Sequence, residues 1–306
     1  MNCCHRIRIL SGYFLSAFLL ILWGLDSYAH AAALPTQRIV SLAPSVTETL
    51  FALGFGAQVV GVTTHCDYPV EAQRLPKIGG FMSPSIEAVI AKRPDFVIGV
   101  RSATDPAKAR ELERLGFKVT LISLASLSDI LASIKDIARL LGRAEAGEKI
   151  AHTIIQQIDE TKKRVAPKPR RSTLLAVGLR PLVVVGGKNY IDELITLAGG
   201  ENIARDAAQP WLNLPDEYVV AKAPQVIIEA GMGSERGKST KNWSDLKSIP
   251  AVKEGRVYSY PSDKILRPGP RVGEGLQEVA RLIHPECFAE FKGGVNSGSG
   301  CESSQP

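Results

Sequence analysis

The stretch EKIAHTIIQQIDETKKRVA, residues 148–166, decides the fold, because it runs without Gly or Pro and is apolar at helical spacing. Ile150, Ile154 and Ile158 recur every four residues, which places them on one face of a helix. We therefore predict one long amphipathic helix over residues 144–166, which separates two parts of the chain.

Short β-branched runs alternate with helical patterns on both sides of this helix. The runs before it are RIVSL (38–42), VVGV (59–62), DFVIGV (95–100) and KVTLI (118–122), and those after it are TLLAVG (173–178), PLVVVGG (181–187), QVIIEAG (225–231) and RVYSY (256–260). Such alternation predicts parallel sheets wound with helices. The predicted fold class is α/β, with two Rossmann-like lobes, residues 34–143 and 167–290, joined by the inter-lobe helix.

Two helix starts in the first lobe carry capping signals. Ser45 stands three residues before Glu48, which is the spacing of a capping box. Ser83 is followed by Pro84, a residue suited to the first helical turn. We predict that helices begin at these two serines.

A weak internal repeat links the two lobes. IEAVIAKRPDFVI, residues 86–98, lines up with DEYVVAKAPQVII, residues 216–228, and Glu, Val, Ala, Lys and Pro match. One interpretation is chance, since Pro stops helices and Glu suits their first turns wherever a helix feeds a strand. The other is a true repeat, in which a pseudo-twofold axis makes Glu87 and Glu217 equivalent surface points.

The first 33 residues have the pattern of a signal peptide. Arg6 and Arg8 precede an apolar run, residues 9–25, and small residues follow it, with A-x-A cleavage options between Ala29 and Ala33. The alternative is an N-terminal membrane anchor, because the run approaches spanning length. The small residues favour cleavage and export, so a periplasmic protein is predicted.

Charge and cysteine content bound the class of protein further. Lys plus Arg number 37 against 31 for Asp plus Glu, and the net +6 is spread along the chain, so nucleic acid is not indicated. Cys66, Cys287 and Cys301 remain after export, and the sequence leaves open which pair forms a disulfide. Residues 291–306 are small and polar and are predicted to form a disordered tail.

No catalytic or metal-binding pattern stands out. The chain has no G-x-S-x-G, G-x-x-x-x-G-K, H-E-x-x-H or C-x-x-C motif. His65, His152 and His284 are spread along the chain and cannot be placed together as ligands of a metal ion. We predict that the protein is not an enzyme and has neither a resident metal nor a cofactor.

Several stretches together resemble the cobalamin, ferric-siderophore and haem branch of the periplasmic binding proteins. These stretches are RIVSLAPSVTETLFALGFGAQVVGVTTHCDYP, GGF with EAVIAKRPDFVI, LAGGENIA, PWLNLPDEYVVAKAPQVIIEAG and RPGPRVGEGLQEVARLIHPE. The resemblance covers residues 38–288, and DYP and RPGPR look more like the cobalamin members. It implies a fold with a helical backbone between the lobes, a monomer, and capture of cobalamin or a related corrinoid for an ABC importer.

The resemblance also implies which residues face the ligand in a cleft between the lobes. Matching motif positions are His65, Tyr68, Phe81, Val183, Trp211 and Asp263. A corrin ring is a flat apolar face edged by amides, so aromatic platforms and a few polar rim groups suit it. His65 and Val183 depart from the aromatics of cobalamin relatives, and a neutral His65 imidazole could coordinate the cobalt of a corrinoid.

In these relatives an exposed glutamate on each lobe docks on arginines of a permease dimer, which works with its ATPase subunits. The matching positions here are Glu87 and Glu217. A pseudo-twofold pair of carboxylates suits a twofold pair of cationic pockets, through charge-assisted hydrogen bonds.

Two rival functions stay open. A ferric-siderophore or haem receptor of the same class would use cations against an anionic chelate, and Arg180, Arg267 and Arg271 could supply them. An enzyme on the same scaffold would need a paired nucleophile and base, which the sequence does not provide.

Overall fold

The computed structural model describes residues 37–231, 243–261 and 263–288. The predicted signal peptide, residues 1–33, and the predicted tail, residues 291–306, lie outside the described residues. From Arg38 onward the described residues form one compact unit, and none of their helices is long and apolar enough to cross a membrane.

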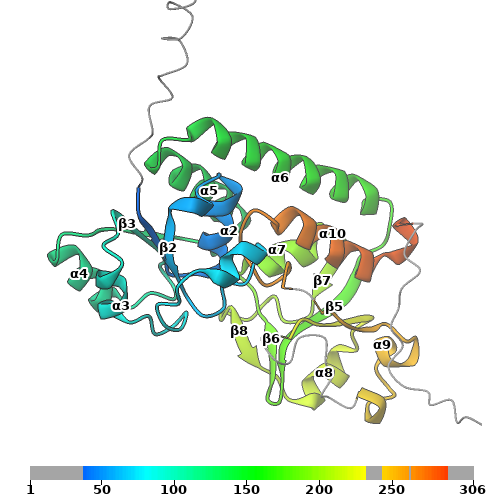
Figure 1. The fold of residues 1–306 in the computed structure, drawn as a ribbon. Helices are drawn as coiled ribbons and strands as arrows, with labels where there is room; N and C mark the ends of the chain where they lie inside the picture. Colours follow the sequence, from blue (N-terminus) through cyan, green and yellow to red (C-terminus); the bar gives the residue numbers. More distant parts are fainter. Residues whose placement is uncertain (1–36, 232–242, 262, 289–306) are drawn as a thin grey trace, which may run out of the picture. The chain divides into compact units, whose positions relative to one another are not determined.

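The first sheet is fully parallel, as the sequence predicts. Its order is β2-β1-β3-β4, with bounds β1 Ile39–Ser41, β2 Val59–Val62, β3 Phe96–Val100 and β4 Lys118–Ile122. The helices around it are α2 Pro44–Ala52, α3 Ile86–Ala91, α4 Pro106–Arg114 and α5 Leu127–Leu140. β3 is buried along its whole length, because parallel strands are covered on both faces (Figure 1).

The second sheet is mixed, which differs from the parallel sheet that the alternation predicts. Its order is β10-β9-β5-β6-β8, with β7 also paired to β5, and the bounds are β5 Arg171–Leu179, β6 Leu182–Val185, β7 Gly200–Asn202, β8 Trp211–Asn213, β9 Val226–Glu229 and β10 Val257–Ser259. β6 is antiparallel to β5 because only Arg180 and Pro181 join them, too short a link for a parallel crossover. β8 is antiparallel to β6, and neither β7 nor β8 has a strand signal long enough to be predicted.

The remaining helices cover the second sheet and tie it to the first. They are α6 Ala144–Val165, α7 Tyr190–Leu197, α8 Asp216–Lys222, α9 Pro250–Lys253 and α10 Val272–Ile283. The long inter-lobe helix is confirmed as α6, a single helix of 22 residues. It packs against α5 of the first half and α10 of the second (Figure 1).

The largest buried cluster draws residues from both halves of the chain. It includes Ile39 and Ile134 from the first half, Ile154 from α6, and Ile195 and Leu276 from the second. The two sheets are separate, while the largest apolar cluster contains residues of both halves. The division into lobes at residues 143 and 167 stays a prediction.

Both predicted helix starts are wrong in detail. α2 begins at Pro44 after Ala43, which makes no side-chain cap, and Ser45 lies buried inside the helix. α3 is capped by Ser85 rather than Ser83, because the Ser85 hydroxyl accepts a hydrogen bond from the Ala88 amide at 3.1 Å. The carboxylate of Glu48, predicted to cap α2, has buried ionic partners instead, described below.

The two repeat segments fold alike. Each helix ends in a left-handed residue before a proline, Arg93 with φ 46° and Ala223 with φ 44°. Asp95 then exchanges hydrogen bonds with the Arg38 backbone, at 2.7 Å in each direction. Gln225 does the same with the Ser172 backbone, at 2.8 and 3.1 Å. The resemblance between the segments thus extends to the backbone, which favours a true repeat over chance.

The contact between α5 and α6 gives a stability prediction at Gly147. A Cβ there would overlap the Cβ of Ala138 and lie 3.3 Å from the Ile134 carbonyl oxygen. Gly147→Val is expected to lower the free energy of unfolding by about 1–3 kcal/mol, because overpacking forces the helices apart. Lys149→Val, at an exposed site of the same helix, is the control. Equal denaturant midpoints for the two variants would show that the helices are not closely packed here.

Candidate ligand-binding site

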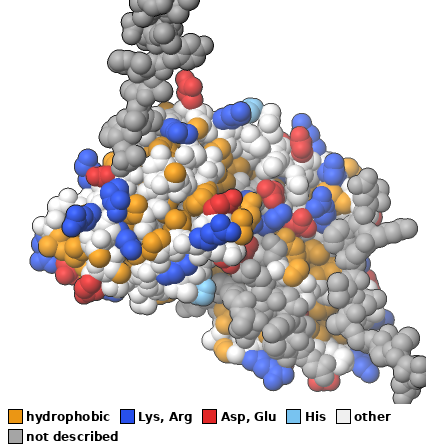
Figure 2. Space-filling view, viewed as in Figure 1, with side chains coloured by type: hydrophobic (Ala, Val, Ile, Leu, Met, Phe, Trp, Pro, Cys, Tyr) orange, Lys and Arg blue, Asp and Glu red, His pale blue; other side chains and the backbone are white. Residues whose placement is uncertain are grey.

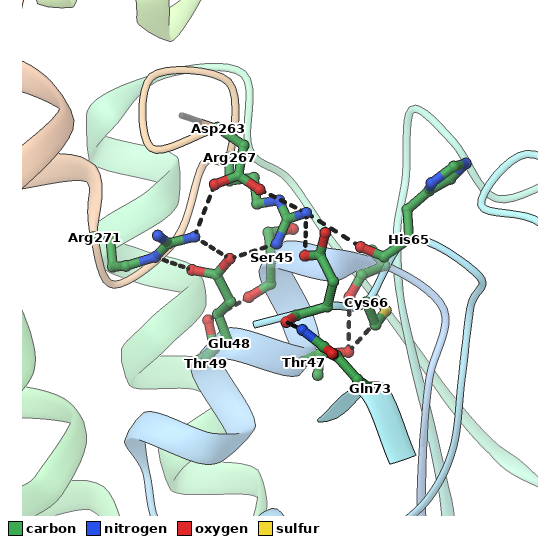
Figure 3. Close-up of polar contacts among 12 residues, drawn as sticks. Ser45, Thr47, Glu48, Thr49, His65, Cys66, Gln73, Asp263, Arg267 and Arg271 are labelled. Atoms are coloured by element: carbon green, nitrogen blue, oxygen red, sulfur yellow. Dashed lines mark hydrogen bonds and ion pairs between the residues drawn. The ribbon is translucent and has the colours of Figure 1, made fainter. Parts of the chain in front are cut away.

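A cluster of charged side chains joins the two halves of the chain, and several predicted ligand residues meet at it. We call it the arginine–carboxylate cluster, and it consists of Glu48, Asp67, Asp263, Arg267 and Arg271. Glu48 comes from α2 and Asp67 from the loop after β2, whereas the other three lie in the segment that leads into α10. Figure 3 shows Glu48 beside Asp263, Arg267 and Arg271 of the second half.

Glu48 is the centre of the cluster and is held by both arginines. Arg271 donates two hydrogen bonds to it, from Nε to Oε2 at 2.8 Å and from Nη2 to Oε1 at 2.6 Å. Arg267 adds a third, from Nη1 to Oε1 at 3.0 Å. Bidentate pairing of this kind is both directional and strong. Glu48 therefore has a structural partner at each arginine, 219 and 223 positions away in sequence.

Arg267 links two chain segments through its second terminal nitrogen. Nη2 lies 2.5 Å from Asp67 Oδ1 and 2.6 Å from Asp263 Oδ2, and it donates to the His65 carbonyl oxygen at 3.2 Å. Arg271 also reaches Asp263, at 3.3 Å. One guanidinium thus fixes the loop after β2 against the segment before α10.

The neighbouring carboxylates outweigh burial in setting the charge state of the two arginines. The side chains of Glu48 and Arg267 are only 2% and 9% exposed. Burial alone would lower the pKa of each arginine, but Asp263, Asp67 and Glu48 outweigh it at Arg267, and Glu48 and Asp263 outweigh it at Arg271, so both pKa values are raised. Both guanidiniums therefore stay cationic and paired with carboxylates.

Tyr68 covers the outer side of the cluster. The Arg271 guanidinium carbon lies 3.9 Å from the centre of the Tyr68 ring, within the range of a cation–π contact. The ring is still 46% exposed. The structure therefore presents Tyr68 as an aromatic surface next to the charged groups.

Hydrogen bonds of Cys66 and Thr64 hold the loop that carries His65 and Tyr68. The Cys66 thiol is buried and lies 3.1 Å from the Thr47 hydroxyl and 3.2 Å from the Thr63 hydroxyl. The Thr64 amide donates to the Gly79 carbonyl oxygen at 3.0 Å, which ties the loop to the segment that contains Phe81. The His65 imidazole is exposed and projects away from the cluster (Figure 3).

The other predicted ligand residues lie in two further places. Phe81 is half-buried and packs against the main core. Val183 and Trp211 are on neighbouring antiparallel strands, where Val183 pairs with Asn213 and Val185 with Trp211. This register puts Val183 and Trp211 on the same face of the sheet as diagonal neighbours. Trp211 is 42% exposed, whereas Val183 is half-buried.

Sequence reasoning missed the two carboxylates that the first half contributes. Glu48 looked like a cap, and Asp67 appeared only as part of the DYP motif. The RPGPR motif at residues 267–271 was the available signal, because two arginines at a predicted helix start are seldom buried without acidic partners. Nothing in the local sequence shows which carboxylates those partners are.

The described residues hold no group of three or more His, Cys, Asp or Glu that could bind a metal ion. His152 is exposed on α6, far along the chain from His65. His284 is buried, with its ring nitrogens 3.1 Å from Glu286 Oε1 and 3.2 Å from the Gly199 carbonyl oxygen. Of the described cysteines, Cys66 and Cys287 are not in disulfides.

Exposed charges outside the cluster are mixed in sign. On the face shown in Figure 2, basic and acidic side chains are interspersed with apolar ones. The two glutamates of the repeat are both exposed, and each is the second residue of its helix, Glu87 in α3 and Glu217 in α8.

The chain has two separate β-sheets covered by helices, and the long helix α6 joins the two halves. Loops of both halves meet at a charged cluster with an exposed tyrosine beside it. These features define a two-sheet solute-binding protein. The chain belongs to the family described as periplasmic binding protein, whose model matches residues 39–264. The α/β fold class predicted from the sequence is confirmed by the structures of this family.

Known proteins of this kind align with most of the chain. A vitamin B12-binding protein of Salmonella paratyphi A is 30% identical over 87% of this chain and 96% of its own. An uncharacterized ABC transporter substrate-binding lipoprotein of Bacillus subtilis is 31% identical over 83% of this chain and 82% of its own. Among solved structures, the periplasmic heme-binding protein RhuT from Roseiflexus sp. RS-1 superposes with a TM-score of 0.74 and 27% identity, over 82% of this chain and 99% of that one.

Proposed function

We propose that this protein captures cobalamin or a related corrinoid outside the cytoplasmic membrane and delivers it to an ABC importer. The observation that carries the proposal is the pair of exposed aromatic side chains, Tyr68 and Trp211, contributed by the two halves of the chain. Large exposed aromatics suit a flat apolar macrocycle. The similarity to a vitamin B12-binding protein supports the same ligand class.

Export, a monomeric state and the absence of catalysis belong to the same proposal. The signal-peptide pattern of residues 1–33 supports export. The family's relatives include binding proteins and an ABC transporter substrate-binding lipoprotein, which supports transport rather than chemistry. The corrinoid is then a cargo and not a cofactor.

His65 is proposed as a ligand of the cobalt in a corrinoid that lacks its own base. Its imidazole is exposed and is directed away from the arginine–carboxylate cluster (Figure 3). Neutral imidazole is a good ligand for a transition metal. The backbone of the loop is held by Cys66 and Thr64, so the ring projects from a fixed position.

Glu87 and Glu217 are proposed to dock on the permease dimer. They occupy the same position in two segments that fold alike, and both are exposed. The Ser85 hydroxyl donates to the Glu87 carboxylate at 2.7 Å, and this bond, with a smaller contribution from Lys108, lowers the pKa of Glu87. A lowered pKa keeps Glu87 ionised in mildly acidic surroundings, as docking on arginines requires.

Absorbance titrations of the mature protein test the ligand. Cyanocobalamin or aquacobinamide is expected to bind one-to-one, and the cobalt bands of aquacobinamide are expected to shift in the wild type but not in His65→Ala. Haem is the second candidate, because a heme-binding protein shares the fold at a TM-score of 0.74. Binding of haem with no binding of either corrinoid would replace the proposed ligand, and equal cobalt spectra would remove the role of His65.

A further inference from the structure

The two arginines at the candidate site are already committed to carboxylates. Within the described part of the chain, Arg267 and Arg271 are paired with three carboxylates, those of Glu48, Asp67 and Asp263. A basic pair that looked available for an anionic ligand is therefore neutralised inside the protein. The same geometry argues against the role that a siderophore receptor would give these arginines.

An anionic ligand could not easily take over these arginines. Arg267 already donates to Glu48 and to the His65 carbonyl oxygen, and Arg271 is covered by the Tyr68 ring. Displacing Glu48 from them would leave a buried carboxylate without compensation, which is strongly unfavourable.

The part of the cluster that a ligand can reach is acidic. The Asp67 side chain is 41% exposed, whereas those of Arg267 and Arg271 are 9% and 11% exposed. A carboxylate accepts hydrogen bonds from amide N–H groups and repels other carboxylates. Asp67 stands next to Tyr68, so a ring lying on Tyr68 would bring its edge groups to this carboxylate.

We infer that the arginine–carboxylate cluster is a charge filter, which selects a macrocycle edged by neutral amides over one edged by carboxylates. The inference rests on the proposed binding function and names the edge chemistry of its ligand. Corrinoids carry amides at the ring edge, haem carries two propionates, and many ferric siderophores are anions. Asp67 is the specificity-determining residue at the rim. Glu48 is paired with Arg267 and Arg271 in the interior, so these arginines cannot attract an anionic ligand.

The test uses two ligands with the same ring and different edges. Cobinamide carries amides where cobyrinic acid carries carboxylates, and the wild type is expected to bind cobinamide about 100-fold more tightly, since like charges at an interface cost several kcal/mol. Asp67→Asn replaces the rim carboxylate by an amide of the same shape. It is expected to remove most of this preference, because it removes the like-charge repulsion at the rim.

The control is Glu71→Gln, which removes an exposed carboxylate four residues away and should leave the preference unchanged. Equal affinity of the wild type for the two corrinoids, or the same preference in Asp67→Asn, would overturn the filter. If neither corrinoid binds, the proposal of a corrinoid ligand is wrong. The charge filter is then tested separately by comparing the affinities for haemin and for its dimethyl ester. Tighter binding of the neutral ester would uphold it, and tighter binding of haemin would overturn it.

Discussion

Glu48→Ala is expected to lower the free energy of unfolding by about 3–5 kcal/mol, because it removes the most buried carboxylate that both guanidiniums share and leaves them only the more exposed Asp67 and Asp263. Glu48 accepts three hydrogen bonds from Arg267 and Arg271, at 2.6 to 3.0 Å. The loss should be seen in guanidinium unfolding of the mature protein followed by circular dichroism, as a lower midpoint with an unchanged slope.

Two further variants separate this pairing from a general effect of losing a carboxylate. Glu71→Ala removes an exposed glutamate and is expected to change stability by less than about 0.5 kcal/mol. The double variant Glu48→Ala/Arg271→Ala is expected to lose less than the sum of the single changes, because each removes the same interaction. A loss below about 1 kcal/mol in Glu48→Ala, or strict additivity, would show that the cluster does not join the halves energetically.

The same cluster shows where prediction from the sequence stops. α6 was predicted nearly to its ends, because Ile150, Ile154 and Ile158 report a helix through local spacing. The strands of the first sheet were found for a similar reason, since each lies in a short run rich in β-branched residues. Features that depend on the spacing of apolar residues or on the length of a run involve only neighbouring residues. They can therefore be predicted from a single sequence.

Features that depend on distant pairing were missed or misread. Glu48 has the spacing of a capping residue, but its partners are more than 200 positions away, and burial of the ion pair decided its orientation. β6 was expected to be parallel, yet its two-residue link to β5 requires a hairpin. β8 has only three residues, Trp211–Asn213, too few to show the alternation of a strand.

The candidate site was predicted only in part, because its charged cluster also depends on pairing between distant residues. The resemblance supplied Asp263, which belongs to the arginine–carboxylate cluster, Tyr68, whose ring lies on Arg271, and His65, which meets the cluster only through its carbonyl oxygen. It also supplied Val183 and Trp211, which share one face of a strand pair. Their role in binding stays a prediction. Asp67 could not be recognised as an acidic rim, because only the structure shows that Arg267 and Arg271 are already occupied.

The double variant Glu87→Ala/Glu217→Ala is expected to abolish delivery of the ligand while leaving its capture unchanged. Both carboxylates are exposed and lie at the second position of helices that fold alike. Each hydrogen-bonded pair with a permease arginine would contribute about 1.5–3 kcal/mol, so losing both should weaken docking by about 100-fold or more. ATP-driven uptake of labelled cobalamin into vesicles that contain the permease and its ATPase subunits measures the effect.

The matched control is Glu113→Ala/Glu201→Ala, which removes two exposed carboxylates at positions outside the repeat. It should transport like the wild type, and absorbance titration should give all three proteins the same ligand affinity. Single changes at Glu87 or Glu217 are expected to lie between wild type and the double variant, because each lobe would keep or lose its own contact with the twofold partner. Uptake at the wild-type rate in the double variant would assign docking to another surface. Reduced ligand affinity in that variant would instead mean that the glutamates act on the binding site.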